Sequence, residues 1–164
     1  MPKPAPTLRL LCGKIASGKS TLASKLAEAE FTVLISQDDW LSALFSDQMT
    51  KGADYLRCSK RLQSIMGQHV TSLLNAGTSV VLDFPANTVA QRAWMRRIIE
   101  KTGAAHELHL LDVPDEICLR RLRERNAQGD HAFATTQEQF HQFSKHFVAP
   151  AQNEGFLIVI HSEK

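Results

Sequence analysis

Residues 10–21 read LLCGKIASGKST, and this stretch limits the possible folds of the chain more than any other. Gly13 to Ser20 match the pattern G-x-x-x-x-G-K-[ST], which joins a buried strand to a helix in phosphate-binding proteins. An apolar run at 7–12 precedes the pattern and an amphipathic run at 20–30 follows it. Because both flanks fit, we expect a nucleotide-binding loop and not a simple turn.

The residue types of the loop indicate how phosphate would be held. Gly13 and Gly18 permit close approach of the backbone, so that the amides of 14–20 can point at phosphate oxygens. Lys19 is expected beside the β- and γ-phosphates, and Ser20 is expected to give its hydroxyl to Mg²⁺. The full set expected to bind ATP is Gly13, Lys14, Ile15, Ala16, Ser17, Gly18, Lys19, Ser20 and Thr21.

Strand-like and helix-like segments alternate along the rest of the chain. Short apolar runs predict strands at 7–12, 31–36, 79–84, 106–113 and 155–161. Amphipathic periodicity predicts helices at 20–30, 55–74, 88–103, 114–126 and 135–147. This order predicts an α/β fold, a P-loop NTPase three-layer α/β/α sandwich with a five-stranded parallel sheet. We expect one domain over 7–164, preceded by a flexible tail at 1–6.

Composition narrows the classes of function. A formal net charge of +2 does not indicate a general nucleic-acid binder. No apolar run approaches the roughly 20 residues of a membrane span, and the proline-rich opening MPKPAPT does not resemble a signal peptide. We therefore expect a cytoplasmic protein. The three cysteines show no C-x-x-C spacing, and Cys12 and Cys118 are expected in the core.

Two carboxylates follow the second predicted strand, in the stretch VLISQDDW at 33–40. Ligands of open α/β sheets bind beyond the carboxyl ends of the strands, and phosphoryl transfer needs a carboxylate beside the acceptor hydroxyl. Asp38 and Asp39 are therefore candidates for that role, with helix capping as the alternative. A chain this short, without the N-K-x-D motif of GTPases, favours a phosphotransferase for a small acceptor.

Further segments resemble one family of small P-loop kinases, the zeta-toxin-like and polynucleotide-kinase-like group that includes chloramphenicol phosphotransferase. The matching segments, in order, are GKIASGKST, SQDD, VVLDFPANT followed by QR, RRLRERN and FVAPAQNEGF. They cover nearly the whole chain, and the glycine loop is the most specific of them.

This resemblance implies roles for individual residues. Asp38 would be the general base, and Asp83 would take a Walker-B-like position, beside Mg²⁺ or the acceptor. Arg121 and Arg125 would be lid arginines that close over the transferring phosphate, and their spacing of four places them on one helix face. The Arg-rich helical lid would span about 115–135, with 126–134 as its tip.

The sequence also departs from this family. Leu41 stands three residues after Asp38, where members often have an arginine, and this weakens the case for a 3′-phosphorylated nucleic-acid end as the acceptor. The segment after Asp83 also differs, so a different acceptor chemistry is expected. The residues expected to line the acceptor pocket are Asp39, Trp40, Asn87 and Arg92.

We therefore expect an ATP- and Mg²⁺-dependent kinase that acts on a hydroxyl of a small molecule. A polynucleotide 5′-hydroxyl kinase is the first alternative, using the basic regions 91–101 and 119–126 as backbone contacts. A nucleotide-binding regulator or weak NTPase without an acceptor is the second. The preference for ATP over GTP depends on the family resemblance alone.

Overall fold

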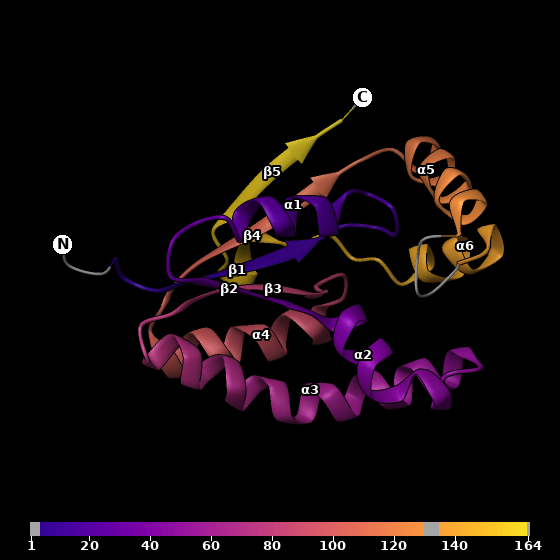
Figure 1. Cartoon of the computed structure of the whole chain (residues 1–164). Coiled ribbons are helices and arrows are strands. Elements are labelled where there is room, and N and C mark those ends of the chain that lie inside the picture. Colours follow the sequence, from indigo (N-terminus) through magenta and orange to yellow (C-terminus); the bar gives the residue numbers. More distant parts are fainter. Residues whose placement is uncertain (1–3, 130–134, 164) are drawn as a thin grey trace.

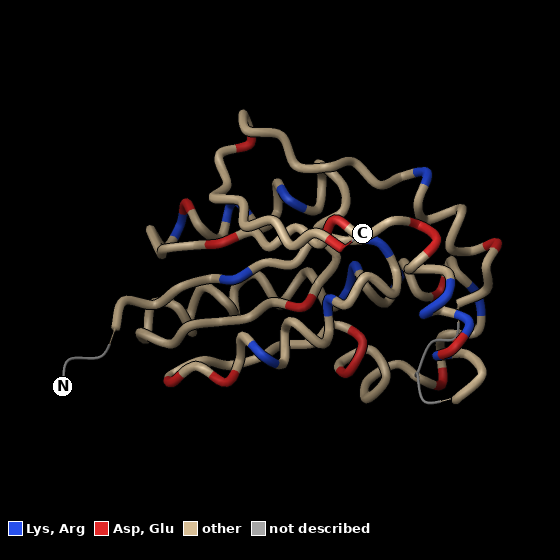
Figure 2. The backbone as a smooth tube through the Cα atoms, turned by 90° about the horizontal axis from the view of Figure 1, so that it is seen from above, with Lys and Arg blue, Asp and Glu red and all other residues tan. Residues whose placement is uncertain are grey.

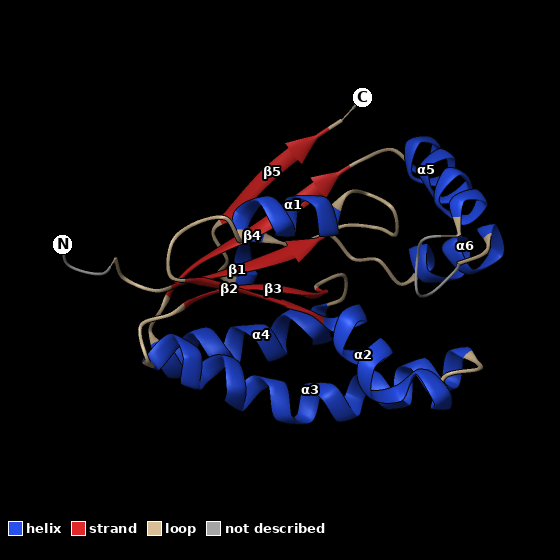
Figure 3. Cartoon of the chain, viewed as in Figure 1, coloured by secondary structure: helices blue, strands red, loops and turns tan. Residues whose placement is uncertain are grey.

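The computed structural model describes residues 4–129 and 135–163 and contains a five-stranded parallel sheet with the strand order β2-β3-β1-β4-β5. Helices lie on both sides of the sheet, which gives the predicted three-layer α/β/α architecture (Figures 1 and 3). The strands are β1 (Thr7–Cys12), β2 (Thr32–Ser36), β3 (Ser79–Pro85), β4 (Ala105–Asp112) and β5 (Ile158–Ser162).

The period of two along β1 divides the core into two parts. Leu8, Leu10 and Cys12 belong to the larger apolar cluster, with residues of α3 (Gly52–Asn75) and α4 (Val89–Thr102). Leu11 points to the opposite face and packs with Ala23 of α1 (Lys19–Leu26). Alternate side chains of one strand therefore anchor different helix layers.

The remaining helices lie at the carboxyl ends of the strands. α2 (Gln37–Phe45) starts where β2 ends and leads through the short 3₁₀ helix η1 (Ser46–Gln48) to α3. α5 (Asp115–Gln128) and α6 (Gln137–Lys145) follow β4, and a second 3₁₀ turn, η2 (Gln152–Glu154), precedes β5. Figure 1 shows α5 and α6 beyond the arrowheads of the strands, at the end of the sheet where the glycine loop lies.

The sequence predicted the strands well and missed some boundaries. α2 was not predicted as an element, because its nine residues are few for a periodic signal. The first helix ends at Leu26 instead of residue 30, since a turn with Phe31 at φ +55° leads the chain into β2. β5 begins three residues later than predicted, because Gly155 at φ +81° still belongs to the turn before it.

Two further expectations can be compared with the described residues. Cys12, Cys58 and Cys118 are all buried and unpaired. Within the described part of the chain, no helix has the length and apolar character needed to cross a membrane. Residues 1–3 of the predicted tail and 130–134 of the predicted lid tip lie outside the described residues.

Candidate active site

The glycine loop between β1 and α1 depends on two glycines. Gly18 has φ +104° and forms the N-cap of α1, a left-handed conformation that L side chains rarely adopt. A Cβ built on Gly13 would lie 2.5 Å from the Oγ of Ser17, so a side chain there would displace the loop. These two positions allow the loop to curve closely around a phosphate group.

Lys19 lies within this curve. Its Nζ donates to the carbonyl oxygens of Gly13 at 2.6 Å and Lys14 at 2.8 Å. Burial lowers the pKa of Lys19, and the nearby Asp83 carboxylate opposes that shift. In this structure the ammonium group is therefore held by backbone carbonyls, which are weaker partners than a phosphate oxygen.

Three contacts from two other segments brace the loop from outside. The amide of Gly13 donates to Asn87 Oδ1 at 2.9 Å, just after β3. Lys14 Nζ lies 2.7 Å from Asp115 Oδ1, in the first turn of α5. Nη1 of Arg121 donates to the carbonyl of Ser17 at 3.3 Å. Contacts from β3 and α5 therefore help to fix the shape of the loop.

Ser20 and Asp83 form a pair of hard oxygen ligands at the end of the loop. The hydroxyl of Ser20 donates to Asp83 Oδ2 at 3.2 Å. Mg²⁺ in kinase sites is usually held by one or two carboxylates together with substrate phosphates and water. No group of three or more His, Cys, Asp or Glu among the described residues could hold a metal, so a cation here would depend on the nucleotide and water for its other ligands. These residues fit Mg²⁺ on that basis.

Asp38 and Asp39 lie in the first turn of α2, opposite the end of β3. Ser36 pairs with Asp83 in the sheet register, so the loop beyond β2 and the end of β3 are side by side. The Ser36 side chain caps α2 by accepting from the Asp39 amide at 3.3 Å, so Ser36, and not either aspartate, is the N-cap. Asp38 is half-buried and Asp39 is exposed.

The carboxylates influence one another electrostatically. Burial raises the pKa of Asp83, and Asp38 and Asp39 act in the same direction. The hydrogen bond from Ser20 and the charge of Lys19 oppose that shift. Asp38, Asp83 and Lys19 thus lie near one another at the carboxyl end of the sheet, where the sequence predicts the reaction centre.

Arg125 of α5 faces the same centre. Its Nε is buried and has no hydrogen-bond partner among the described residues. Burial lowers the pKa of Arg125, and the carboxylate of Asp38 opposes the shift. A buried donor without an acceptor is rare in a folded protein, and an anionic ligand would satisfy it.

Arg121 shares a helix face with Arg125 but has different partners. Its Nη2 donates to both carboxylate oxygens of Glu163, at 2.7 and 2.6 Å, while Nη1 contacts the loop carbonyl of Ser17. Figure 2 shows acidic and basic positions mixed at the end of the molecule where α5 lies. Arg121 therefore braces the glycine loop in this structure, and its role at the transferring phosphate stays a prediction.

Two residues expected in the acceptor pocket have partners within the protein. Arg92 is fully buried, and its guanidinium contacts Glu154 and the carbonyls of Ala86, Val148 and Ala149. The prediction for Arg92 was wrong, because α4 turns this side chain into the core. There its charge is neutralised by the carboxylate of Glu154, which lies 62 residues later in the sequence. The side-chain oxygen of Asn87 accepts from the Gly13 amide, so Asn87 supports the glycine loop in this structure, and its place in an acceptor pocket stays a prediction.

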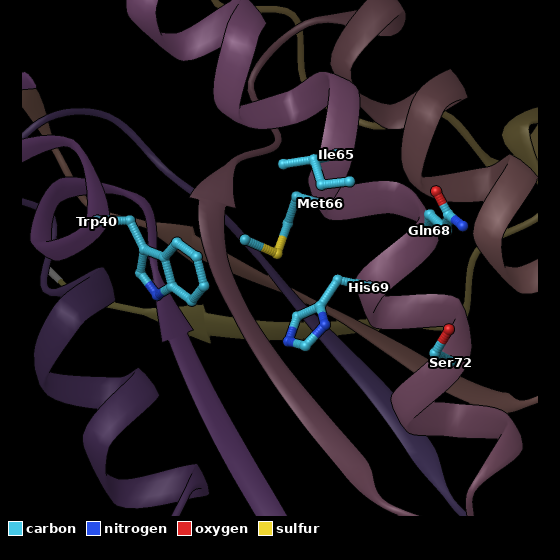
Figure 4. A pocket seen from close by; sticks show the side chains of 6 residues that line it. All are labelled: Trp40, Ile65, Met66, Gln68, His69 and Ser72. Atoms are coloured by element: carbon cyan, nitrogen blue, oxygen red, sulfur yellow. The ribbon is translucent and has the colours of Figure 1, made fainter. Parts of the chain in front are cut away.

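Trp40 lines a pocket on another side of α2. This pocket, of about 320 Å³, lies between α2 and α3 and is lined by Trp40, Ile65, Met66, Gln68, His69 and Ser72 (Figure 4). The Trp40 and His69 rings lie 6.3 Å apart. The Trp40 ring therefore faces α3, and its role at an acceptor stays a prediction.

Sequence reasoning missed Tyr55 and Gln37, which contact each other beside Asp38. Gln37 is buried, and its Nε2 lies 3.0 Å from the Tyr55 hydroxyl, which is 3.5 Å from Asp38 Oδ1. One signal was present in the sequence. Tyr55 shares a helical face with Cys58 and Leu62, both buried, so a polar group was predictable at the edge of the core.

Comparison with known proteins provides a family. A family model described as AAA domain matches residues 8–150. This span includes the glycine loop, Asp38, Asp83 and α5. No curated protein sequence matches the chain.

Several solved structures share the fold at low sequence identity. A provisionally assigned kinase from Chloroflexus aurantiacus superposes with a TM-score of 0.78 and 17% identity, covering 97% of this chain and 89% of that one. A sugar kinase from Janibacter sp. HTCC2649 gives 0.68 and 16%, covering 97% and 86%. The Mycobacterium tuberculosis APS kinase CysC, in complex with AMPPNP and APS, gives 0.61 and 21%, covering 96% and 89%. These likenesses establish a P-loop kinase-like fold.

Proposed function

Because this chain belongs to the AAA domain family, with a match that spans residues 8–150, we propose that it is an ATP-dependent kinase acting on a hydroxyl of a small molecule. The observation that carries this proposal is the convergence of Asp38, Asp83 and Arg125 beside Lys19. Binding of the nucleotide with Mg²⁺ would account for Lys19 and Asp83, but it would need neither a second carboxylate at Asp38 nor an unsatisfied arginine donor at Arg125. Together they match the requirements of phosphoryl transfer.

Each residue has a task in the proposed reaction. The amides of the glycine loop hold the phosphates, and Lys19 exchanges its carbonyl partners for phosphate oxygens. Ser20 and Asp83 would hold Mg²⁺, which supplies positive charge against the phosphate oxygens when it is bound. Arg125 would pair its buried donor with the transferring group, where a fixed guanidinium stabilises developing negative charge.

Asp38 would act on the acceptor. It orients the hydroxyl and takes its proton as the acceptor oxygen bonds to the terminal phosphorus. The bond between that phosphorus and the oxygen of the ADP leaving group breaks, and ADP departs. The half-buried position of Asp38, at the start of a helix and facing Arg125, suits a base that must stay ionised.

Two structural neighbours agree with a small acceptor, whereas another belongs to an RNA repair complex. Of the two, one is a sugar kinase, and the other holds AMPPNP and APS, both small molecules. The polynucleotide alternative loses one of its expected contacts, because Arg92, in the basic region 91–101, is fully buried. We therefore favour a small metabolite over a nucleic-acid end.

Transfer from γ-labelled ATP to a panel of sugars, nucleosides, other metabolites and 5′-hydroxyl oligonucleotides tests this proposal. Wild type should label one acceptor class, Asp38→Asn should abolish labelling, and Asp47→Asn, an exposed carboxylate of η1, should leave labelling unchanged. Lys19→Ala should weaken ATP binding. Slow hydrolysis of equal rate in wild type and Asp38→Asn, with no labelled acceptor, would overturn the kinase proposal in favour of an acceptor-free regulator. A labelled oligonucleotide would overturn the small-molecule assignment.

A further inference from the structure

A hydrogen-bonded trio joins α2 to α3 beside the reaction centre. Tyr55 lies in the first turn of α3, and its hydroxyl is 3.0 Å from Gln37 Nε2 and 3.5 Å from Asp38 Oδ1. Gln37 and Asp38 are the first two residues of α2. The contact therefore links the proposed base to a helix that starts fourteen residues later in the chain.

The chemistry of the three groups fixes the direction of these bonds. The amide nitrogen of Gln37 can only donate, so the Tyr55 oxygen accepts from it. The tyrosine proton is then available to the carboxylate, which accepts when it is ionised. Burial raises the pKa of Tyr55 and the negative charge of Asp38 adds to that shift, so the hydroxyl keeps its proton at neutral pH.

We propose that Tyr55 is a positioning residue, whose hydroxyl donates to Asp38 and sets the orientation of that carboxylate toward the acceptor. This inference rests on the proposed role of Asp38 as the base of a kinase. Tyr55 does not contact the reacting atoms and acts through Asp38.

The surrounding packing makes Tyr55 suited to this role. Cys58 and Leu62 anchor the same face of α3 in the core, and Leu41 anchors α2 there, with 0–2% of each side chain exposed. A donor mounted on one fixed helix can therefore hold a carboxylate mounted on another.

One experiment reads this contact without any turnover. Tyr55 is the only tyrosine of the chain, so protein labelled with ¹³C at the tyrosine ring carbon that bears the hydroxyl gives a single NMR resonance. We expect Asp38→Asn to shift that resonance, and Asp47→Asn to leave it in place. An unchanged resonance in Asp38→Asn would overturn the proposal. Because no acceptor is needed, a shift would be seen even if the kinase activity itself were disproved.

The kinetic test uses Tyr55→Phe, which keeps the ring and removes only the hydroxyl. We expect kcat to fall by about 10- to 100-fold, the usual consequence of a misplaced catalytic group, with little change in KM for ATP. The acidic limb of the pH profile of kcat should move to higher pH, because a lost donor no longer favours the ionised carboxylate. Equal kcat and equal pH profiles in wild type and Tyr55→Phe would overturn the proposal, and if this variant fails to fold, the NMR comparison still decides.

Discussion

Arg92 on α4 and Arg125 on α5 both have guanidinium nitrogens removed from solvent, and the two side chains have opposite environments. Every guanidinium nitrogen of Arg92 has an acceptor, from Glu154 or from backbone carbonyls near the ends of β3 and α6. The Nε of Arg125 has none among the described residues. Burial is common to both, so burial does not identify a functional arginine. The unsatisfied donor distinguishes Arg125 from Arg92, because folded proteins rarely leave a buried donor without an acceptor.

The largest effect is expected from replacing Arg92, the arginine whose guanidinium nitrogens all have acceptors. Arg92→Met should lower the free energy of unfolding by about 3–5 kcal/mol, because it removes the buried cation of an ion pair and leaves Glu154 and the Ala86 carbonyl without their donor. Urea denaturation measures this loss. Arg97→Met, an exposed arginine of the same helix, is the control and should change the value by less than about 0.5 kcal/mol. A stable Arg92→Met would mean that the buried network is unimportant for folding.

Replacing Arg125 should have the opposite pattern of effects, with a loss of activity and no loss of stability. Arg125→Ala should reduce kcat by about 10²- to 10³-fold, as expected for a lost electrostatic contact in the transition state. Its free energy of unfolding should hold or rise, because an unpartnered donor disappears. Steady-state kinetics and urea denaturation on the same preparation check both statements, and Arg120→Ala, exposed on the same helix, serves as the control. If Arg125→Ala were destabilised and kept a normal kcat, Arg125 would be a structural residue like Arg92.

His109 is a titratable side chain that also has a buried nitrogen without a hydrogen-bond partner among the described residues. It is buried, its Nδ1 lies 2.9 Å from His161 Nε2, and its Nε2 has no hydrogen-bond partner among the described residues. Burial lowers the pKa of His109, although Glu107 opposes the shift. Below the usual histidine pKa of about 6.5, the unfolded chain therefore binds more protons than the folded protein does. The free energy of unfolding decreases as the pH is lowered, by at most about 1.4 kcal/mol per pH unit.

Urea denaturation between pH 7.5 and 5.5 measures that slope. His109→Asn should flatten it, whereas His141→Asn, exposed on α6, should leave it unchanged. Equal slopes for wild type and His109→Asn would show that His109 titrates as in the unfolded chain.

Arg121 is intermediate between Arg92 and Arg125, and the smallest effect is expected there. Glu163→Gln removes the charge that holds Arg121 against the glycine loop, in an ion pair whose side chains are 35% and 49% exposed. Such pairs contribute about 0.2–1 kcal/mol, so KM for ATP should rise by no more than about fivefold, and added salt should reduce the difference. Glu124→Gln, exposed on α5, is the control. An unchanged KM at low salt would show that the loop needs no support from this pair.

The sequence predicted most of what local patterns determine. The glycine loop, the five strands and the convergence of Asp38 and Asp83 follow from motif spacing and from the rule that parallel strands end at one edge of the sheet. Arg121 and Arg125 share a face because they are four residues apart.

The remainder depends on contacts between distant parts of the chain. Arg92 was expected in the acceptor pocket because its partner, Glu154, lies 62 residues away and nothing near Arg92 indicates it. Trp40 was expected there because an aromatic residue just past a predicted strand could stack on a flat acceptor, but the unpredicted helix α2 turns it toward His69. The support of Asp38 by Tyr55 likewise needs the observed packing of α2 on α3.

The bond from Gly13 to Asn87 has a consequence for how such a protein can diversify. One side chain after β3 fixes the entry to the donor loop, and its backbone carbonyl also accepts from Val148 at 2.9 Å. A change of acceptor that remodels residues 83–87 would therefore disturb nucleotide binding as well. In a library of variants selected for new acceptors, we therefore expect Asn87 to stay invariant.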